Sequence, residues 1–306
     1  MEVKYELLIV GAGPAGITAA LYANRAGLNV AFMDGGVPGG KLVNTYEIEN
    51  YPGVGLMNGA DLASKMFMQV MDAGVPFEYG NVVDIIDHGE YKEVVLESGD
   101  SMNVKTVLIA TGTKERLLNI PGEEQYSGHG VSYCAVCDGA FFKDKQVTVI
   151  GGGNSALEEA MYLTQHASNV RIVIRRDVFR ADESVQKKLS ENNKISIVTK
   201  HVPVEIKGTD GVVSSIVLKN VDTDELTELQ TDAVFPYIGA DASTSMCKHL
   251  DILDQRGYII ANEKMETSVP GVYAAGDVVA KQLRQVVTAV NDGAIAAQNI
   301  YHYLKG

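Results

Sequence analysis

Cysteine, long apolar runs and positive charge are all scarce in this chain of 306 residues. Three cysteines are too few for the disulfide framework that holds small secreted domains together. The chain contains no run of about 18 apolar residues, which is the length needed to cross a membrane. The N-terminal residues also lack a signal-peptide pattern, so we expect a cytoplasmic protein. With 26 Lys and Arg against 39 Asp and Glu, the net charge of −13 argues against nucleic acid or a membrane surface as a partner.

Glycine, in contrast, is abundant, with 31 residues, and it marks two similar segments. The apolar runs Leu7–Val10 and Val147–Ile150 are each followed at once by a glycine-rich loop and a helical pattern, in register with an offset of 140 residues. Two copies of this strand–loop–helix pattern are much stronger evidence than one G-x-G-x-x-G motif alone. The loop residues are Gly11, Gly13, Pro14, Ala15 and Gly16 in the first copy and Gly151, Gly153, Asn154, Ser155 and Ala156 in the second.

Such loops predict dinucleotide binding, because glycine lets the backbone approach a pyrophosphate at the positive end of the following helix. In the first copy, Asp34 is suited to form hydrogen bonds with the ribose hydroxyls of an adenosine that carries no phosphate on them. In the second copy Ile174 takes the corresponding position, and a cluster that can bind a 2′-phosphate follows it: Arg175, Arg176 and Arg180. We expect FAD or NAD at the first site and NADPH at the second. A solvated surface patch is the alternative interpretation of the arginines.

The pattern of elements predicts an α/β protein with two Rossmann-like dinucleotide-binding domains, the second inserted in the first. No third nucleotide motif occurs after about residue 240, and the remaining residues are too few for another domain of this kind. We therefore assign residues 1–113 and 245–306 to the first domain and 114–244 to the second. A terminal helix is expected from about Leu283 to Leu304.

A C-x-x-C motif, Cys134 to Cys137, lies between the two glycine loops. Half of a zinc site is one interpretation, but zinc needs about four ligands and no second pair of this kind is present. Redox chemistry is favoured, because two intervening residues let a disulfide open and close with little backbone motion. Asp138 is a candidate general acid or, alternatively, a turn or helix cap. We expect no metal site.

Two smaller features concern the core. Met66, Met68 and Met71 lie in one helical stretch and are expected to fill core space. Cys247 stands apart from the other cysteines and is expected to be a small buried residue.

The run Gly130–Gly139, the second glycine loop, the Arg175–Arg176 cluster and the pair Gly276–Asp277 resemble the bacterial low-molecular-weight thioredoxin reductases, in order and at matching spacing over essentially the whole chain. The resemblance implies a homodimer that passes electrons from NADPH through FAD and a redox disulfide to thioredoxin. It also implies that Cys137 faces the flavin, that Cys134 attacks the thioredoxin disulfide, and that Asp138 supplies a proton.

The resemblance further implies two sets of cofactor-binding residues. The FAD set comprises the first glycine loop, Asp34, Gly35, Gly39, Gly40, Lys41, Leu42, Asn50, Val83, Thr111, Gly112, Gly276, Asp277, Arg284, Gln285 and Val286. The NADPH set comprises the second glycine loop, Arg175, Arg176, Arg180, Ile238 and Gly239. Two residues depart from the family. Lys41 replaces the usual glutamine near the flavin, and Ile174 replaces a histidine, which we expect to weaken but not abolish the preference for NADPH.

The cysteine pair is only 14 residues before Gly151, so it belongs to the NADPH domain while FAD belongs to the other. The cysteine pair and NADPH must both reach the same flavin ring, and Cys134 must also reach a protein partner. One fixed arrangement of the two domains would not allow all of these contacts. We therefore expect the inserted domain to rotate about connections near Thr113–Gly122 and Gly239–Thr244. Three alternatives remain: electrons from ferredoxin or another flavoprotein, a nucleotide sensor without turnover, and a peroxiredoxin or glutaredoxin-like acceptor.

Overall fold

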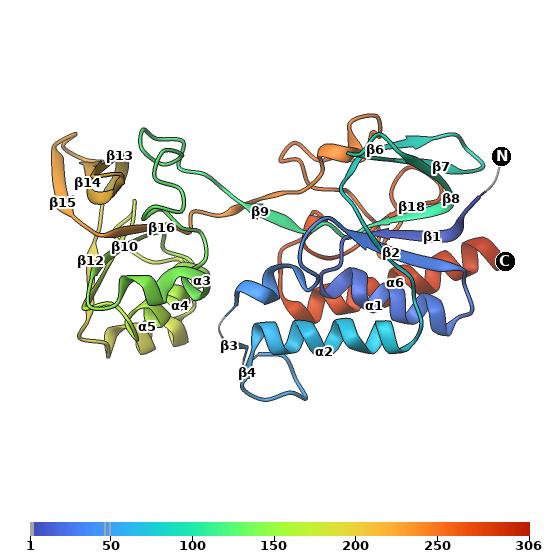
Figure 1. Ribbon diagram of the computed structural model, residues 1–306, viewed down its shortest axis with the longest axis horizontal. Helices are drawn as coiled ribbons and strands as arrows, with labels where there is room; N and C mark the ends of the chain where they lie inside the picture. The colour runs from blue at the N-terminus through green and yellow to red at the C-terminus, as the bar shows by residue number, and fades with distance from the viewer. Residues whose placement is uncertain (1–2, 46, 49) are drawn as a thin grey trace. The chain divides into compact units, whose positions relative to one another are not determined.

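The computed structural model describes residues 3–45, 47–48 and 50–306. The chain divides into two compact units (Figure 1). Unit 1 consists of Met1–Lys114 and Asp241–Gly306, and unit 2 of Glu115–Ala240. The sequence placed these boundaries at 113/114 and 244/245. Unit 2 is thus inserted in unit 1, and the expected α/β class with a nested second nucleotide-binding fold is confirmed.

Unit 1 is built on a mixed sheet with the strand order β5-β2-β1-β8-β7-β6, and β18 also pairs with β8. Its strands are β1 (Tyr5–Val10), β2 (Val30–Asp34), β5 (Phe77–Tyr79), β6 (Val82–Asp87), β7 (Lys92–Leu96), β8 (Ser101–Ile109) and β18 (Val272–Ala274). β1 runs parallel to both β2 and β8, whereas β6 and β7 are antiparallel. Residues Leu7–Ile9 are fully buried, as expected for a parallel strand covered on both faces.

Helices cover one face of this sheet. They are α1 (Pro14–Arg25), α2 (Gly59–Asp72) and α6 (Val286–Lys305), and their core contacts include Ala19, Ala23 and Ala296. The short elements are η1 (Gly40–Asn44), β3 (Glu47–Ile48), β4 (Met57–Asn58), η3 (Ser245–Cys247) and η4 (Gly276–Val278). α6 begins at Val286 rather than near Leu283, because a reciprocal capping box between Gln285 and Thr288 fixes its first turn.

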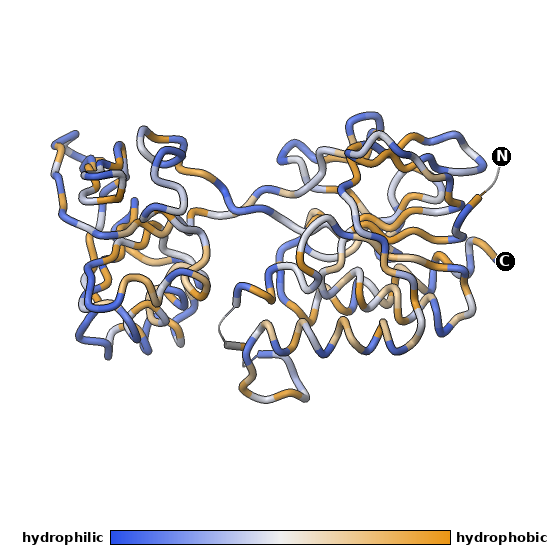
Figure 2. The backbone as a smooth tube through the Cα atoms, viewed as in Figure 1, coloured by the Kyte–Doolittle hydropathy of each residue, from blue (hydrophilic) through white to orange (hydrophobic). Residues whose placement is uncertain are grey.

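Unit 2 contains a parallel sheet with the order β12-β11-β10-β16 and an antiparallel sheet with the order β13-β14-β15. The strands are β10 (Gln146–Ile150), β11 (Asn169–Val173), β12 (Ile195–Val198), β13 (His201–Thr209), β14 (Val212–Asn220), β15 (Leu226–Gln230) and β16 (Ala233–Pro236). The helices are α3 (Ala135–Asp138), η2 (Gly139–Phe142), α4 (Asn154–Leu163) and α5 (Glu183–Ser190). Apolar residues line the parallel strands of the unit 1 sheet and of the β12-β11-β10-β16 sheet of unit 2 (Figure 2).

The internal repeat survives in the strand register. Leu7 of β1 pairs with Val30 of β2, and Val147 of β10 pairs with Val170 of β11, so the 140-residue offset holds for both strands. Two short strands, β9 (Thr113–Glu115) and β17 (Ala240–Ala242), lie where the chain passes between the units and pair with each other. The two expected hinge connections are therefore joined by a β-ladder.

The predictions about the core had mixed outcomes. Cys247 is buried, as expected, and burial raises the pKa of its thiol to about 12. The methionine prediction was wrong for Met68 and Met71, which are 51% and 37% exposed, while Met66 packs against the core. The methionine spacing predicted that all three side chains would lie on the buried face of α2. That face includes Met66 but not Met68 or Met71.

Candidate active site

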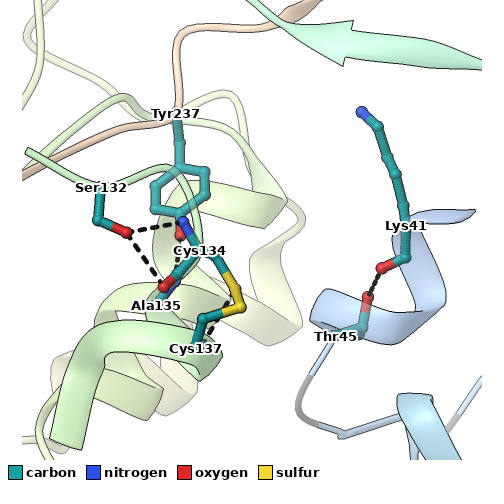
Figure 3. The surroundings of a disulfide bond; sticks show 7 residues. All are labelled: Lys41, Thr45, Ser132, Cys134, Ala135, Cys137 and Tyr237. Atoms are coloured by element: carbon teal, nitrogen blue, oxygen red, sulfur yellow. Dashed lines mark hydrogen bonds between the residues drawn. A yellow bond between two sulfur atoms is a disulfide. The ribbon is translucent and has the colours of Figure 1, made fainter. Parts of the chain in front are cut away.

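Cys134 and Cys137 form a disulfide, with their Cα atoms 5.3 Å apart (Figure 3). The pair spans the short helix α3, where Cys134 is the N-cap residue. Its Sγ atom accepts a hydrogen bond from the backbone N–H of Cys137 at 3.0 Å. The backbone N–H of Cys137 therefore points at the Cys134 sulfur from within the first turn of this helix.

The backbone around Cys134 is held by two neighbouring hydroxyl groups (Figure 3). Ser132 Oγ accepts from the N–H of Cys134 at 3.1 Å and donates to its carbonyl oxygen at 3.3 Å. The Tyr237 hydroxyl, which follows β16, accepts from the N–H of Ala135 at 3.0 Å. Cys134 is half-buried and Cys137 is exposed.

Asp138 is the last residue of α3 and is half-buried. It also precedes η2, but its side chain makes no capping hydrogen bond to that element. The alternative interpretation of Asp138 as a helix cap is therefore not supported. The prediction that Asp138 is a general acid rests on its position directly after the second cysteine.

Sequence reasoning missed a buried carboxylate behind the cysteines. Glu123 is 4% exposed and accepts from the N–H groups of Leu118 at 2.8 Å and Asn119 at 2.6 Å. The Tyr133 hydroxyl donates to the same carboxylate at 2.6 Å. Glu123 thus ties the segment after β9 to the residue that precedes Cys134, and no local sequence pattern marks this contact.

A second missed acid is Glu159 on α4. Its Oε2 atom is buried and has no hydrogen-bond partner among the described residues. Burial, helped by the charges of Glu158 and Glu115, raises the pKa of the Glu159 carboxyl to about 7. Burial and the charge of Glu159 also raise the pKa of Tyr237, so Glu159 lies near the phenol that contacts the cysteine helix.

The first glycine loop connects β1 to α1 with the geometry that a dinucleotide requires. Gly11 has φ +110°, and a Cβ there would lie 2.4 Å from the carbonyl oxygen of Ala110. A Cβ on Gly13 would meet nothing within 4 Å, so the backbone is open to a ligand at this residue. Asp34 at the end of β2 accepts from the N–H groups of Ala12 at 2.7 Å and Gly36 at 2.8 Å. The carboxylate therefore also fixes the loop.

Other predicted FAD residues gather on unit 1. Asn50 donates to the Gln285 side chain at 3.0 Å, although 235 positions separate them. Leu42 is buried in a cluster against which Val286 packs. The Lys41 carbonyl accepts from the Thr45 hydroxyl at 2.9 Å (Figure 3).

The remaining residues of this set are spread over unit 1. Thr111 Oγ1 donates to the Ser243 carbonyl at 2.7 Å, and Gly112 accepts from the N–H of Ser243. Gly39 donates its N–H to the Ala12 carbonyl, which brings Gly39 and Gly40 beside the first loop. Val83 lies on β6 and is 42% exposed.

Asp277 in η4 has a buried carboxylate oxygen that no described protein group pairs. Its Oδ1 atom is buried without a hydrogen-bond partner among the described residues. Burial raises the pKa of the carboxyl, against the opposing charges of Lys281, Lys41 and Arg284. Arg284 itself donates to the carbonyls of Asp277 and Val279, both at 3.1 Å. Because a buried polar atom is normally paired, Asp277 is suited to bind a ligand hydroxyl.

The second glycine loop connects β10 to α4. Gly151 has φ +144°, and a Cβ there would lie 2.2 Å from the Tyr237 carbonyl oxygen. Gly153 again faces open space. Asn154 is linked reciprocally to Asp182, at 2.7 and 2.8 Å. The loop is thereby joined to the chain segment that follows the arginine cluster.

The arginine cluster follows β11 at the edge of the same site. The N–H of Arg180 donates to the Gly152 carbonyl at 2.7 Å, which holds the cluster against the loop. Arg175, Arg176 and Arg180 are all exposed, whereas Ile174 is buried in the core of unit 2. Ile238 is partly buried and Gly239 is exposed.

The described residues contain no group of three or more His, Cys, Asp or Glu side chains that could hold a metal ion. Within residues 3–45, 47–48 and 50–306, no helix has the length and apolar character that a membrane crossing requires.

Comparison with known proteins agrees with this geometry. Residues 5–293 match the model of the pyridine nucleotide-disulphide oxidoreductases. A thioredoxin reductase of Bacillus subtilis is 44% identical over 304 residues, covering 99% of this chain and 96% of that protein. The Lactococcus lactis thioredoxin reductase structure superposes with a TM-score of 0.96 at 47% identity, over 98% of this chain and 99% of that one. The structure of the T. acidophilum thioredoxin reductase superposes with a TM-score of 0.94 at 34% identity, over the whole of both chains.

The chain therefore belongs to the pyridine nucleotide-disulphide oxidoreductase family. Members of this family use a flavin and a pyridine nucleotide. Within the family, the resemblance to the bacterial low-molecular-weight thioredoxin reductases that the cysteine, glycine and arginine motifs indicated is confirmed.

Proposed function

We propose that this protein is an NADPH-dependent thioredoxin reductase, which passes electrons through FAD and the Cys134–Cys137 disulfide to oxidised thioredoxin. The observation that carries the proposal is the disulfide itself, at the start of a helix in the unit that also holds the arginine-flanked glycine loop. Curated relatives of nearly the same length carry the name of this activity.

FAD would bind to unit 1. The open face of Gly13 and the unpartnered Oδ1 atom of Asp277 both fit a dinucleotide with a sugar-alcohol chain. The other residues of the FAD set named from the sequence belong to the same unit. When bound there, FAD would supply two-electron transfer from the nicotinamide to the Cys134–Cys137 disulfide. Lys41 adds a positive charge near Asp277 that the usual glutamine would not supply.

NADPH would bind to unit 2. Gly153 leaves room for the pyrophosphate, and the exposed guanidinium groups of Arg175, Arg176 and Arg180 are suited to the 2′-phosphate. Ile174 is buried and cannot contribute to phosphate binding, so these three arginines supply the selectivity. Their retention also argues against ferredoxin as the electron donor.

The sulfur chemistry follows from the two different environments. Two electrons open the Cys134–Cys137 bond and leave one thiolate and one thiol after uptake of one proton. The Cys134 thiolate, stabilised by the N–H of Cys137, attacks the thioredoxin disulfide and forms a mixed disulfide. Cys137 then attacks Cys134, which restores the internal disulfide and releases reduced thioredoxin. Asp138 would donate and recover the proton that these steps require.

The paired connections β9 and β17 suggest how one disulfide serves both a flavin and a protein. Unit 2 would rotate about them between the two half-reactions. We further propose that the protein is a homodimer in the cytoplasm. In that reducing environment a cysteine pair serves redox turnover and not a structural disulfide.

The test is NADPH oxidation in the presence of oxidised thioredoxin from the same organism, compared with NADH. We expect a yellow protein that prefers NADPH, and loss of turnover in Cys134→Ser with flavin reduction by NADPH retained. Cys247→Ser is the matched control, since that thiol is free and buried and takes no part in the proposed reaction. A protein that stays colourless after flavin supplementation, or a Cys134→Ser variant with full disulfide-reducing activity, would overturn the proposal.

A further inference from the structure

A buried ion pair lies directly behind the Gly276–Asp277 turn. Lys281 Nζ and Asp292 Oδ2 are 2.6 Å apart, and their side chains are only 18% and 9% exposed. Lys281 belongs to the segment between η4 and α6, and Asp292 to α6 itself. Burying two charges costs free energy that their mutual attraction does not always recover, so such a pair is weak evidence for a stabilising role alone.

The same carboxylate oxygen also binds the turn. Asp292 Oδ2 accepts from the backbone N–H of Gly276 at 3.0 Å. Gly276 has φ +81°, and a Cβ there would lie 2.9 Å from the Cβ of Ala15 in α1. The next residue of α6, Gly293, lies so close to α1 that a Cβ would be 2.2 Å from the Ala15 carbonyl oxygen. Asp292 therefore anchors the turn at the place where α6 presses against the first glycine loop.

The turn carries a buried carboxylate oxygen that is able to accept a further hydrogen bond. Asp277 follows Gly276, and its Oδ1 atom is buried without a partner in the described part of the chain. Arg284 holds the Asp277 carbonyl at 3.1 Å and stacks over the Tyr258 ring at 4.2 Å. The backbone on both sides of Asp277 is thus fixed by charged groups, and Lys281 also places positive charge near its carboxylate.

We propose that Lys281 and Asp292 are positioning residues for flavin binding: they hold the Gly276–Asp277 turn so that Asp277 Oδ1 accepts a hydrogen bond from a hydroxyl group of the flavin's sugar-alcohol chain. The inference rests on the proposed FAD site. Asp292 fixes the backbone, and Lys281 fixes Asp292 and offsets its charge. Neither residue touches the reacting atoms.

The experiment measures FAD affinity of the apoprotein by quenching of flavin fluorescence, together with the visible spectrum of the bound flavin. Lys281→Met keeps the apolar stem and removes the charge. We expect its Kd for FAD to rise at least about tenfold, with a changed band shape of the bound flavin. Lys281→Arg should recover most of the affinity, because it restores the charge.

Lys305→Met is the matched control, since Lys305 also pairs with a carboxylate, Glu6, but does so at the far end of α6 and on the surface. Its Kd should stay within about twofold of wild type. Circular dichroism of each apoprotein establishes that it is folded. Asp292→Asn is the second variant, and its FAD affinity and visible spectrum are measured in the same way. If the wild-type protein binds no FAD, the proposed function fails. If it binds FAD and Lys281→Met binds equally well with an unchanged spectrum, only the role of the pair is wrong.

Discussion

The hydroxyl of Tyr237 accepts a hydrogen bond at 3.0 Å from the backbone N–H of Ala135, the first residue of the helix that carries the disulfide. The two residues are 102 positions apart in the sequence. This contact joins the end of the parallel sheet in unit 2 to the redox centre.

Tyr237→Phe should therefore loosen the cysteine helix. The substitution leaves the N–H of buried Ala135 without an acceptor, which costs roughly 1–3 kcal/mol. We expect a lower urea midpoint and faster amide hydrogen exchange over residues 134–138. Tyr126→Phe is the control, because it also removes a hydroxyl in unit 2, one that accepts from the Gln125 side chain. Equal exchange in the two variants would contradict the prediction.

Glu159 should make stability depend on pH. Its folded-state pKa of about 7 lies above the ordinary value of 4.5. The folded state therefore holds the proton more tightly, and this stabilisation is complete below about pH 4.5 and is lost as the pH rises through 7. The loss is about 3 kcal/mol between pH 4.5 and 8.

Urea denaturation at several pH values checks this. Glu159→Gln, which cannot ionise, should lack this part of the decline and exceed the wild type in stability at pH 8. Glu183→Gln, on the exposed surface of α5, should follow the wild-type curve. The same decline in wild type and Glu159→Gln would exclude Glu159 as its source.

Glu123→Gln should destabilise unit 2. The amide replaces a carboxylate that accepts three hydrogen bonds in a buried site, and its NH2 group takes the place of one oxygen and so meets the backbone N–H of either Leu118 or Asn119. We expect a loss of about 2–4 kcal/mol in the free energy of unfolding. Glu124→Gln, the exposed neighbour, should change it by less than about 0.5 kcal/mol. Comparable losses in both would refute the role assigned to the Glu123 carboxylate.

The arginine cluster should determine nucleotide choice. Arg175→Ala combined with Arg176→Ala should raise the KM for NADPH about tenfold or more, because two charge-assisted contacts to the 2′-phosphate are lost. The KM for NADH should hardly change. Steady-state kinetics with both nucleotides measure this, with Arg25→Ala at the end of α1 as a control for surface charge. A parallel rise for NADH would show that the arginines do not read the phosphate.

Much of the site was predictable because its signals are local. A glycine loop, the strand before it and the helix after it occupy about 25 consecutive residues, so both copies and their common register could be found without coordinates. The cysteine pair is likewise a four-residue pattern. The methionines of α2 show the limit of such reasoning, since Met68 fits the apolar spacing but is exposed.

The sequence by itself determined that two dinucleotide-binding units are nested and that one of them carries a redox disulfide. Only the tertiary structure decided which polar groups support these sites: Tyr237 on the cysteine helix, Glu123 behind Tyr133, and Asp292 under Gly276. The physical reason is that a hydrogen bond between distant residues depends on the close approach of folded elements and leaves no periodic trace in the chain. Burial, the largest cause of the raised pKa of Glu159, likewise depends on folded elements that pack around it.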